Sequence, residues 1–287
     1  MKIIKSVIEM TSYCNELRDK SRTAFIPTMG NLHQGHLALF EHGKAIADTV
    51  ICSIYVNPTQ FGINEDLATY PRTETADLTL LKKAGVSVVF CPDVEEMYPF
   101  GRTDFTKVSC GALDQMLCSI TRPHFFTGVS TVVLKLLNIV QPHILVLGEK
   151  DFQQIAVIKR ICSELFLPVN IETVPTVRDP SGLALSSRNQ YLSPDEKKKA
   201  AILYKIISEA KKDIEAKPNK LQSPQYLSSI EEHAKIALVE HGFKIDYLDI
   251  IDQDTLLKSA TSRNLVIAIA CVLNTTRLID NVKITLN

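Results

Sequence analysis

Short apolar runs alternate with segments of helical periodicity through the first 178 residues of the chain. Continuous apolar runs are typical of strands that are buried on both faces of a sheet. The pattern predicts strands at residues 23–28, 50–56, 86–90, 143–147 and 169–174, and helices at residues 34–48, 73–84, 129–140 and 152–165. This alternation of strands and helices indicates an α/β fold with a doubly wound parallel sheet.

The pattern changes in the last third of the chain. Ser193 followed by Pro194, Asp195 and Glu196 is typical of a helix start, because a capping residue precedes proline and acids in the first turn. The remaining predicted elements are a helix to residue 216, a polar loop at 217–225, a helix at 226–240, and strands of an antiparallel sheet at 244–250, 264–272 and 277–284. We therefore predict a smaller α+β domain at the carboxyl end.

A turn-rich stretch, Arg178-Asp179-Pro180-Ser181-Gly182, separates the two patterns. Proline, glycine and short polar residues concentrate where a chain turns between folded parts. We place the domain boundary here, which gives a first domain at residues 1–178 and a second at residues 179–287.

Charge balance narrows the function classes. Lysine and arginine total 32 in the 287 residues, aspartate and glutamate also total 32, and the formal net charge is zero. Nucleic-acid-binding proteins usually carry a basic surplus, because neutralising phosphates supplies much of their affinity. We therefore expect no nucleic-acid partner.

The distribution of apolar residues and cysteines indicates in which cellular compartment the protein is expected. The first residues contain no signal-peptide core, and the longest apolar run, of about eight residues at 266–273, is far short of the roughly 20 that span a bilayer. The seven cysteines are odd in number and contain no C-x-x-C pair, which favours buried free thiols in a reducing compartment. We expect a cytoplasmic protein with no membrane partner.

The segment PTMGNLHQGH, at residues 27–36, is the strongest candidate for chemistry. It begins where the first predicted strand ends and runs into the first predicted helix, and ligands of open α/β sheets bind at such positions. A helix start offers free N–H groups to phosphate, while Gly30 and Gly35 allow a nucleotide to approach the backbone. His33 and His36 share one face and can donate to a phosphoryl group as its charge develops. The alternative is two surface histidines beside an ordinary turn.

Three further polar segments follow strands or turns. Asn57-Pro58-Thr59-Gln60 offers neutral hydrogen-bonding groups for a small hydroxylated substrate, although alone it is more typical of a turn. Gly148-Glu149-Lys150-Asp151 can meet a phosphate through its lysine and ribose hydroxyls through Asp151, or can simply be a charged helix start. Leu185-Ser186-Ser187-Arg188-Asn189 suits a polyphosphate, and its alternative is a hydrophilic loop.

The pattern H-x-G-H in this position resembles the HIGH signature of a superfamily of nucleotidyl-transferring enzymes, and the whole decapeptide resembles the version PTMGALHxGH of the pantothenate synthetase family. Asn31 replaces the usual alanine. The segment R-P-H-F-F-T-G-V at residues 122–129 is similar to the family pattern R-P-x-H-F-x-G-V, with Phe125 where histidine is usual. The resemblance covers essentially the whole chain, including residues 277–281, and implies a Rossmann-like first domain.

The resemblance implies a reaction and a set of partners. Members of the family join (R)-pantoate to β-alanine with ATP through a pantoyl adenylate, releasing pyrophosphate and AMP. It also implies Mg²⁺ on the phosphates without a dedicated protein metal site, and a homodimer. Because the loop Ser186-Ser187-Arg188 lies beyond the turn at residues 179–182, we expect the carboxyl-terminal domain to close over ATP as a lid.

The resemblance also implies roles for particular residues. Those expected in catalysis are His36, His33, Lys150 and Arg188. Those expected to bind ATP are Pro27, Thr28, Met29, Gly30, His33, Gly35, His36, Gly148, Glu149, Lys150, Asp151, Val177, Leu185, Ser186, Ser187 and Arg188. Those expected to bind pantoate or β-alanine are Asn57, Gln60, Gln154 and Arg122.

Three other functions remain open at the level of sequence. A nucleotidylyltransferase acting on a phosphate acceptor would share the H-x-G-H site, but the asparagine and glutamine at positions 57 and 60 favour a neutral hydroxy acid over a phosphate. The only feature that favours a non-catalytic nucleotide-binding protein is Phe125, which stands where the family usually has histidine. A tRNA-binding synthetase fragment is disfavoured because the chain has no basic excess.

Overall fold

The computed structural model describes residues 1–63, 65–221 and 223–286. Its contacts group these residues into two compact units. The first unit contains Met1–Gln115, Arg122–Glu149 and Val157–Pro175, and the second contains Met116–Thr121, Lys150–Ala156 and Thr176–Asn287 as far as that range is described. The division into domains at residue 178 stays a prediction.

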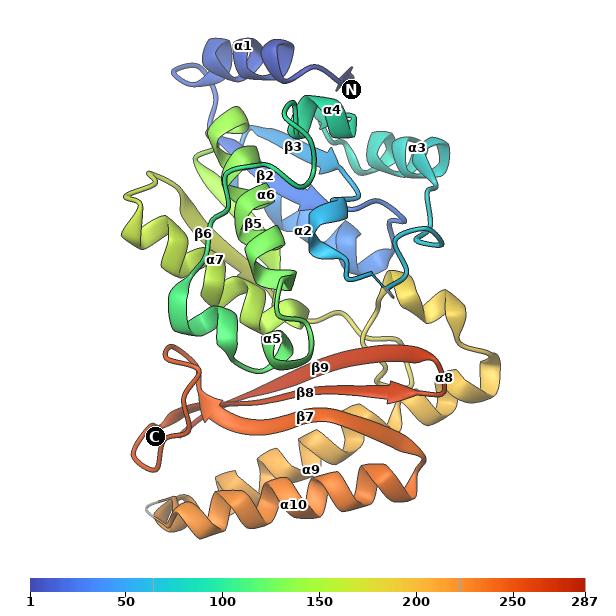
Figure 1. Cartoon of the computed structure of the whole chain (residues 1–287), viewed down its shortest axis with the longest axis vertical. Coiled ribbons are helices and arrows are strands. Elements are labelled where there is room, and N and C mark those ends of the chain that lie inside the picture. The colour runs from blue at the N-terminus through green and yellow to red at the C-terminus, as the bar shows by residue number, and fades with distance from the viewer. Residues whose placement is uncertain (64, 222, 287) are drawn as a thin grey trace. The chain divides into compact units, whose positions relative to one another are not determined.

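The first unit is built on a six-stranded sheet in the order β1-β4-β3-β2-β5-β6, and all its pairings are parallel (Figure 1). The strands are β1 (Lys2–Ile4), β2 (Thr23–Thr28), β3 (Thr49–Ile54), β4 (Val88–Phe90), β5 (Ile144–Gly148) and β6 (Asn170–Val174). The inner strands are almost wholly buried, as their apolar runs predict. The predicted α/β class with a doubly wound parallel sheet is confirmed.

The order of the strands creates a switch point between β2 and β5. From β2 the chain builds outward through β3 and β4 on one side, and it adds β5 and β6 on the other. Ligands of open α/β sheets bind outside the carboxyl ends of the strands at this point. The loop after β2 begins at Met29 and contains the histidine motif, and Glu149 follows β5, so the histidine motif and Gly148–Glu149 lie at this edge.

The helices of the first unit connect these strands. They are α1 (Val7–Leu17), α2 (Gln34–Ile46), α3 (Glu74–Ala84), α4 (Val94–Met97), α6 (Phe125–Val140) and α7 (Phe152–Glu164), whose first residues group with the second unit. Gly85 ends α3 in a left-handed conformation, with φ of 78°, which glycine adopts without steric cost. The sequence pattern missed β1 and α1, because β1 has three residues and α1 buries only Met10 and Cys14.

The second unit contains a three-stranded antiparallel sheet in the order β7-β8-β9. Its strands are β7 (Phe243–Asp252), β8 (Asn264–Leu273) and β9 (Thr276–Thr285), and its longer helices are α8 (Pro194–Ala200), α9 (Ile202–Ala216) and α10 (Pro224–Glu240). Helices α9 and α10 lie along one face of the sheet (Figure 1). The predicted α+β fold of this part of the chain, with an antiparallel sheet, is confirmed.

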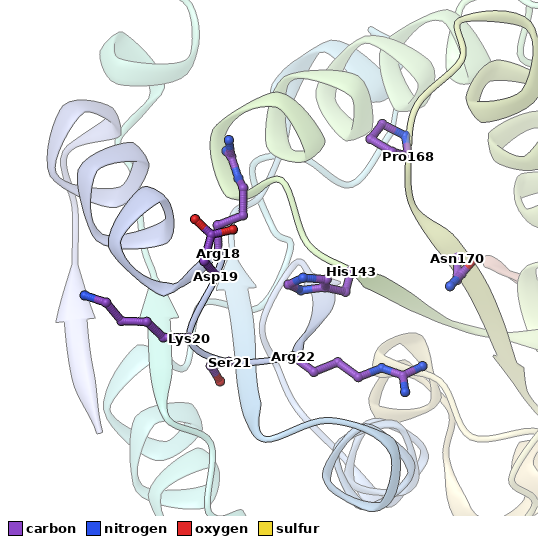
Figure 2. A pocket seen from close by; sticks show the side chains of 8 residues that line it. All are labelled: Arg18, Asp19, Lys20, Ser21, Arg22, His143, Pro168 and Asn170. Atoms are coloured by element: carbon purple, nitrogen blue, oxygen red, sulfur yellow. The ribbon is translucent and has the colours of Figure 1, made fainter.

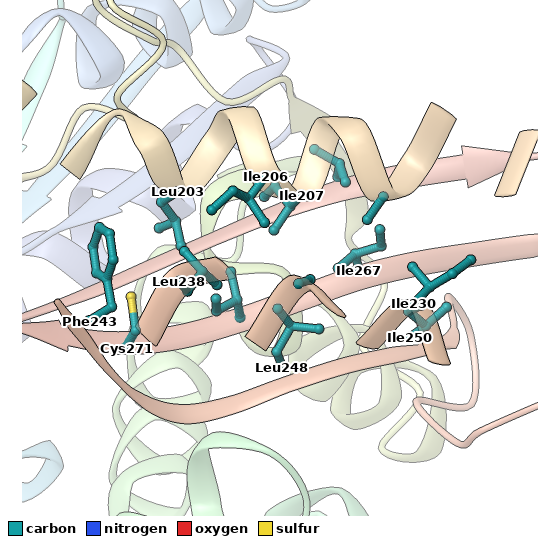
Figure 3. Packing of buried hydrophobic residues seen from close by; sticks show 14 of the residues in the cluster. Leu203, Ile206, Ile207, Ile230, Leu238, Phe243, Leu248, Ile250, Ile267 and Cys271 are labelled. Carbon is teal, nitrogen blue, oxygen red and sulfur yellow. The ribbon is translucent and has the colours of Figure 1, made fainter. Parts of the chain in front are cut away.

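Aliphatic side chains from these helices and strands form the core of the second unit (Figure 3). Leu203 and Ile207 of α9, Leu238 of α10, Leu248 of β7 and Ile267 of β8 are each at most 2 % exposed. Burying a side chain of this size contributes about 1.5–3 kcal/mol. This core holds the sheet and the two helices together as one body.

The helix predicted from Ser193 to residue 216 is wrong in one respect, because the structure divides it at Ala201 into α8 and α9. Ala201 keeps right-handed helical dihedrals, so no proline or glycine marks the break in the sequence. The predicted start is confirmed: the Ser193 hydroxyl accepts from the Glu196 amide, and the Glu196 carboxylate accepts from the Ser193 amide. The predicted loop at 217–225 includes residue 222, which lies outside the described residues.

All seven cysteines are buried free thiols, as predicted. Burial raises the pKa of the Cys91 and Cys162 thiols to about 11, so these side chains stay protonated and unreactive at neutral pH. Within the described residues, every helix is too short or too polar to cross a bilayer.

Candidate active site

The loop between β2 and α2 depends on two consecutive residues with positive φ. Gly30 has φ of 77° and Asn31 has φ of 51°. A Cβ atom at Gly30 would lie 3.0 Å from Asp77 Oδ2 and 3.1 Å from Ile54 Cγ2, so glycine is required there on two grounds. Asparagine tolerates the left-handed region better than alanine does, which explains why Asn31 is compatible with the loop.

A buried carboxylate from α3 holds this loop in place. Asp77 is 3 % exposed and accepts from the amides of Asn31 at 2.9 Å and Leu32 at 2.8 Å. Its Oδ2 also accepts from the Thr73 hydroxyl at 3.0 Å. Sequence reasoning missed this residue, because an acid in the first turn of a helix has the ordinary explanation of favourable interaction with the helix dipole.

We expect Asp77→Asn to destabilise the protein by about 1–3 kcal/mol, because an amide nitrogen would face one of the two loop N–H groups. Thermal unfolding measures this loss, at about 2–4 °C per kcal/mol for a protein of this size. Asp93→Asn is the matched control, since Asp93 is exposed and makes no side-chain cap bond at the start of α4. Equal unfolding temperatures for the two variants would contradict the clamping role of Asp77.

The two histidines form a capping box at the start of α2. The His33 Nδ1 accepts from the Gly35 amide at 3.1 Å, and the His36 Nδ1 accepts from the His33 amide at 3.3 Å. Because each Nδ1 is an acceptor, each neutral imidazole carries its proton on Nε2. The ring centroids are 4.1 Å apart. The loop therefore fixes two imidazole rings at a helix N-terminus, an arrangement that suits a phosphate group.

The segment after β3 forms a short 3₁₀ helix, η1 (Pro58–Gln60), capped by Asn57. Asn57 is 1 % exposed, and its side chain donates to Gln60 Oε1 at 3.1 Å and to the Gly128 carbonyl at 3.2 Å. Gln60 is half-buried and donates through Nε2 to Met29 Sδ at 3.0 Å. The predicted Asn57–Gln60 pair thus lies next to the loop that follows β2.

Arg122 has several partners within the first unit. Its Nε donates to Glu65 Oε1 at 2.5 Å, a second bond joins the same carboxylate, and the Gln60 carbonyl accepts at 3.4 Å. The guanidinium carbon lies 3.8 Å from the centroid of the Phe125 ring, which is a favourable stacking distance. Phe125, the departure from the family pattern, therefore supports Arg122 directly.

The end of β5 contributes Gly148 and Glu149 to the same edge of the sheet. Both are half-buried, and Glu149 Oε1 accepts from the Thr173 hydroxyl of β6 at 3.0 Å. A Cβ atom at Gly148 would have Leu39 Cδ2 of α2 at 3.8 Å. Gly148 therefore leaves the backbone at this point accessible beside α2.

In the second unit, Lys150 forms a loose ion pair with Asp151 at 3.7 Å, and its carbonyl accepts from Asn281 at 3.0 Å. Gln153 is buried and bonded to the backbone of Met116 and Cys118, which makes it structural. Gln154 is half-buried, and its side chain makes no hydrogen bond to the described part of the chain. Of the adjacent glutamines Gln153 and Gln154, only Gln154 therefore has a side chain suited to bind a ligand.

The remaining predicted site residues, Val177 and Leu185–Arg188, lie in a segment that is held by hydrogen bonds within the second unit. The Leu185 amide donates to the Val177 carbonyl at 3.0 Å, and the Ser186 hydroxyl accepts from the Arg188 amide at 3.3 Å. Ser186, Ser187 and Arg188 are half-buried.

The base of this loop is held by a buried ion pair. Arg178 donates to both carboxylate oxygens of Asp280, at 2.6 and 2.7 Å, and its guanidinium carbon lies 3.5 Å from the Tyr204 ring centroid. Asp280 is 4 % exposed, so this bidentate pair is well ordered. The carboxyl-terminal segment that resembles the family therefore has a structural role at Asp280.

A separate hollow of about 570 Å³ lies at the amino ends of β2, β5 and β6, the edge opposite the motif loops (Figure 2). His143 lines it and accepts through Nδ1 from the Thr23 amide at 3.1 Å. Lys20 and Arg22 extend in opposite directions, so the cations do not converge on one ligand position (Figure 2). The hollow contains none of the predicted site residues.

The structure describes the predicted residues in two groups. The first unit brings together the loop after β2, the Asn57–Gln60 segment, Arg122 and the end of β5, while Lys150, Asp151, Gln154 and the loop from Val177 to Arg188 belong to the second unit. Sequence reasoning missed Asp77 and also Tyr98, whose hydroxyl donates to Asn57 Oδ1 at 2.8 Å. It assigned no role to Glu65, the partner of Arg122. These contributions depend on contacts between distant segments.

The fold and the first of these groups define a class: α/β proteins that carry an H-x-G-H signature at the switch point of a parallel sheet. The model of the pantoate-beta-alanine ligase family matches residues 2–283. The chain is 46 % identical to the pantothenate synthetase of Pseudomonas savastanoi pv. phaseolicola over 287 residues, which cover 99 % of each chain.

Two solved structures are similar over almost the whole chain. Pantothenate synthetase from Thermus thermophilus has a TM-score of 0.88 at 38 % identity, covering 99 % of this chain and 100 % of that one. Pantoate-beta-alanine ligase from Francisella tularensis, solved with beta-gamma ATP and beta-alanine, has a TM-score of 0.79 at 33 % identity, covering 98 % and 97 %.

The chain belongs to the pantoate-beta-alanine ligase family, and it is an enzyme. Family membership over the full length supports a carboxylate–amine ligase over the alternative of a nucleotidylyltransferase with a phosphate acceptor.

Proposed function

We propose that the enzyme condenses (R)-pantoate with β-alanine at the expense of ATP, giving pantothenate, AMP and pyrophosphate. The observation that carries this proposal is the capping box of His33 and His36, which fixes both imidazole rings through Nδ1 at the start of α2, at the switch point of the sheet. Donors fixed before the reaction stabilise charge as it develops on a phosphoryl group.

The chemistry explains why ATP is needed. An amine does not displace oxide from a carboxylate, because the carboxylate is anionic and its leaving group is poor. The pantoate carboxylate first attacks the α-phosphorus of ATP, forming the pantoyl adenylate and releasing pyrophosphate. The amine of β-alanine then attacks the carbonyl carbon of this mixed anhydride, and AMP leaves with the bonding electrons.

The proposed roles of the residues follow this sequence of steps. His33 and His36 hydrogen-bond the phosphates, and Lys150, Ser186, Ser187 and Arg188 hold the departing pyrophosphate. The other residues of the ATP site are Pro27, Thr28, Met29, Gly30, Gly35, Gly148, Glu149, Asp151, Val177 and Leu185. Backbone groups at a helix start and point charges of lysine and arginine are the protein's usual means of holding polyphosphates.

Gln60 and Gln154 bind pantoate in this proposal, Gln60 and Asn57 lie near β-alanine with Asn57 acting through its bond to Gln60, and Arg122 contacts substrate. A site whose amides hydrogen-bond substrate oxygens rejects analogues that lack them, because its own polar groups would be left unpaired. The glutamines therefore provide specificity for a hydroxy acid.

Mg²⁺ is proposed as the metal that accompanies ATP, and it would neutralise charge on the phosphates. Among the residues that the structure describes, no group of three or more His, Cys, Asp or Glu is arranged to hold a metal ion. Mg²⁺ commonly keeps its waters and binds through substrate phosphates, which fits this donor set. A homodimer located in the cytoplasm completes the proposal.

The test is AMP formation by the purified protein with ATP, Mg²⁺, pantoate and β-alanine, each omitted in turn. We expect AMP only when all four are present, apart from a single turnover at most when β-alanine is left out. Steady AMP formation without pantoate, or with a phosphorylated acceptor in its place, would contradict the proposed function.

A further inference from the structure

Both polar atoms of the Asn57 side chain already have hydrogen-bond partners within the protein. Its two N–H groups donate to Gln60 Oε1 and to the Gly128 carbonyl. Its Oδ1 accepts from the Tyr98 hydroxyl at 2.8 Å and from the Thr59 hydroxyl at 3.0 Å, and the Thr59 amide lies at 3.4 Å. Since the side chain is 1 % exposed, a substrate could bond Asn57 only by displacing one of these partners.

These partners fix which way the amide of Asn57 points. The Gly128 carbonyl can only accept and the Thr59 amide can only donate, so the nitrogen and oxygen of Asn57 are assigned from both ends. The atom of Gln60 that faces the Asn57 nitrogen must then be its oxygen. As a result, the Gln60 nitrogen lies on the opposite side of its amide, where Met29 Sδ is 3.0 Å away.

Tyr98, in the core of the first unit, stabilises this arrangement of Asn57 and Gln60. Its side chain is 3 % exposed, and its hydroxyl lies 2.9 Å from the Thr59 hydroxyl as well as bonding Asn57. The Lys135 ammonium lies 4.1 Å from the Tyr98 ring centroid and donates to the Met97 carbonyl at 2.6 Å. Burial raises the pKa of Tyr98, so its hydroxyl remains a proton donor at neutral pH.

We infer that Asn57 and Tyr98 are positioning residues, which hold the Gln60 amide so that an N–H group faces an oxygen acceptor of the substrate. The inference rests on the proposed function, in which Gln60 binds pantoate. The acceptors on pantoate are its carboxylate and hydroxyl oxygens. An inverted Gln60 amide would present an oxygen to them and repel the carboxylate.

The first test compares Tyr98→Phe with Tyr55→Phe. Tyr55 is the matched control, because it is also buried and its hydroxyl has no hydrogen-bond partner among the described residues. Loss of one hydrogen bond predicts a rise of about three- to tenfold in the KM for pantoate in Tyr98→Phe, with the KM for ATP within about twofold of wild type. Pantoate-dependent pyrophosphate release gives both constants, and we expect Tyr55→Phe to match wild type.

A second test asks whether Tyr98 acts through Gln60. In a Gln60→Ala background the Tyr98→Phe change should add nothing to the KM for pantoate, because the group it positions is absent. Asn57→Asp places an oxygen toward the Gly128 carbonyl and should raise the KM for pantoate more than tenfold. Thermal unfolding of every variant reports whether the fold is retained.

The outcomes separate this inference from the proposed function. A wild-type enzyme without pantoate-dependent pyrophosphate release rejects both. An active wild type overturns the inference alone if Tyr98→Phe behaves like Tyr55→Phe, if it raises both KM values equally, or if its effect persists in the Gln60→Ala background. An unchanged KM for pantoate in Asn57→Asp also overturns it.

Discussion

Replacing His36 by asparagine should lower kcat for pantoate-dependent pyrophosphate release by about 10²–10³, the usual loss when one preorganised donor to developing charge is removed. Asparagine retains an oxygen that can accept from the His33 amide, as Nδ1 of His36 does at 3.3 Å, but it lacks the Nε2–H group. The cap of α2 is therefore preserved while the donor is lost. Rapid-quench or coupled assays of pyrophosphate release measure the effect.

Two further variants test whether the loss of rate is specific to the Nε2–H donor of His36. His36→Gln restores a donor near the position of Nε2 and should recover part of the lost rate. His42→Asn is the matched control on the same helix, since His42 faces Glu172 at 3.8 Å and belongs to none of the predicted segments. A wild-type rate for His36→Asn, or an equal loss for His42→Asn, would contradict the role of His36.

Gly128→Ala should damage both the stability of the first unit and the use of pantoate. A Cβ atom there would lie 2.4 Å from the Thr59 carbonyl oxygen and 2.8 Å from Gln60 Cα, both of them backbone atoms that cannot rotate away. Such overpacking costs about 1–3 kcal/mol, and it must push η1 away from α6. The displacement would also break the bond from Asn57 to the Gly128 carbonyl.

We therefore expect Gly128→Ala to lower both the unfolding temperature and, by more than tenfold, kcat/KM for pantoate. Gly62→Ala is the control, because the atoms nearest to a Cβ there belong to the Glu65 side chain and lie 3.5 Å away or more, which is ordinary van der Waals contact. Thermal unfolding and pantoate titrations at saturating ATP measure the two effects. Retention of wild-type stability and pantoate kinetics by Gly128→Ala would show that η1 does not need this close approach.

The sequence predicted the sheet and the elements around the motif loops because their local signals agree with the fold. The β2 strand, at Thr23–Thr28, was predicted to the residue, since a buried apolar run ends at a turn and a helix cap. Tertiary pairing determines the rest: β1 has three residues and exists because it pairs with β4. The break between α8 and α9 has no local signal, because Ala201 stays in the helical region.

The candidate site was predicted only in part, because only some of its residues belong to a local sequence motif. His33 and His36 lie in a contiguous motif, so their common face and their place at a helix start follow from spacing alone. Asp77 lies 46 residues from Asn31, and Tyr98 lies 41 residues from Asn57, and nothing local connects them. A structure is needed to see that these residues hold the loops on which the predicted ones lie.

The central claim is that this site transfers AMP to the carboxylate of pantoate before the amine reacts. Exchange of labelled pyrophosphate into ATP, with Mg²⁺ and pantoate but without β-alanine, tests it most directly. The account predicts exchange that requires pantoate, proceeds without β-alanine and falls by about 10²–10³ in His36→Asn. Exchange that is independent of pantoate, or AMP formation with all substrates but no exchange, would contradict it.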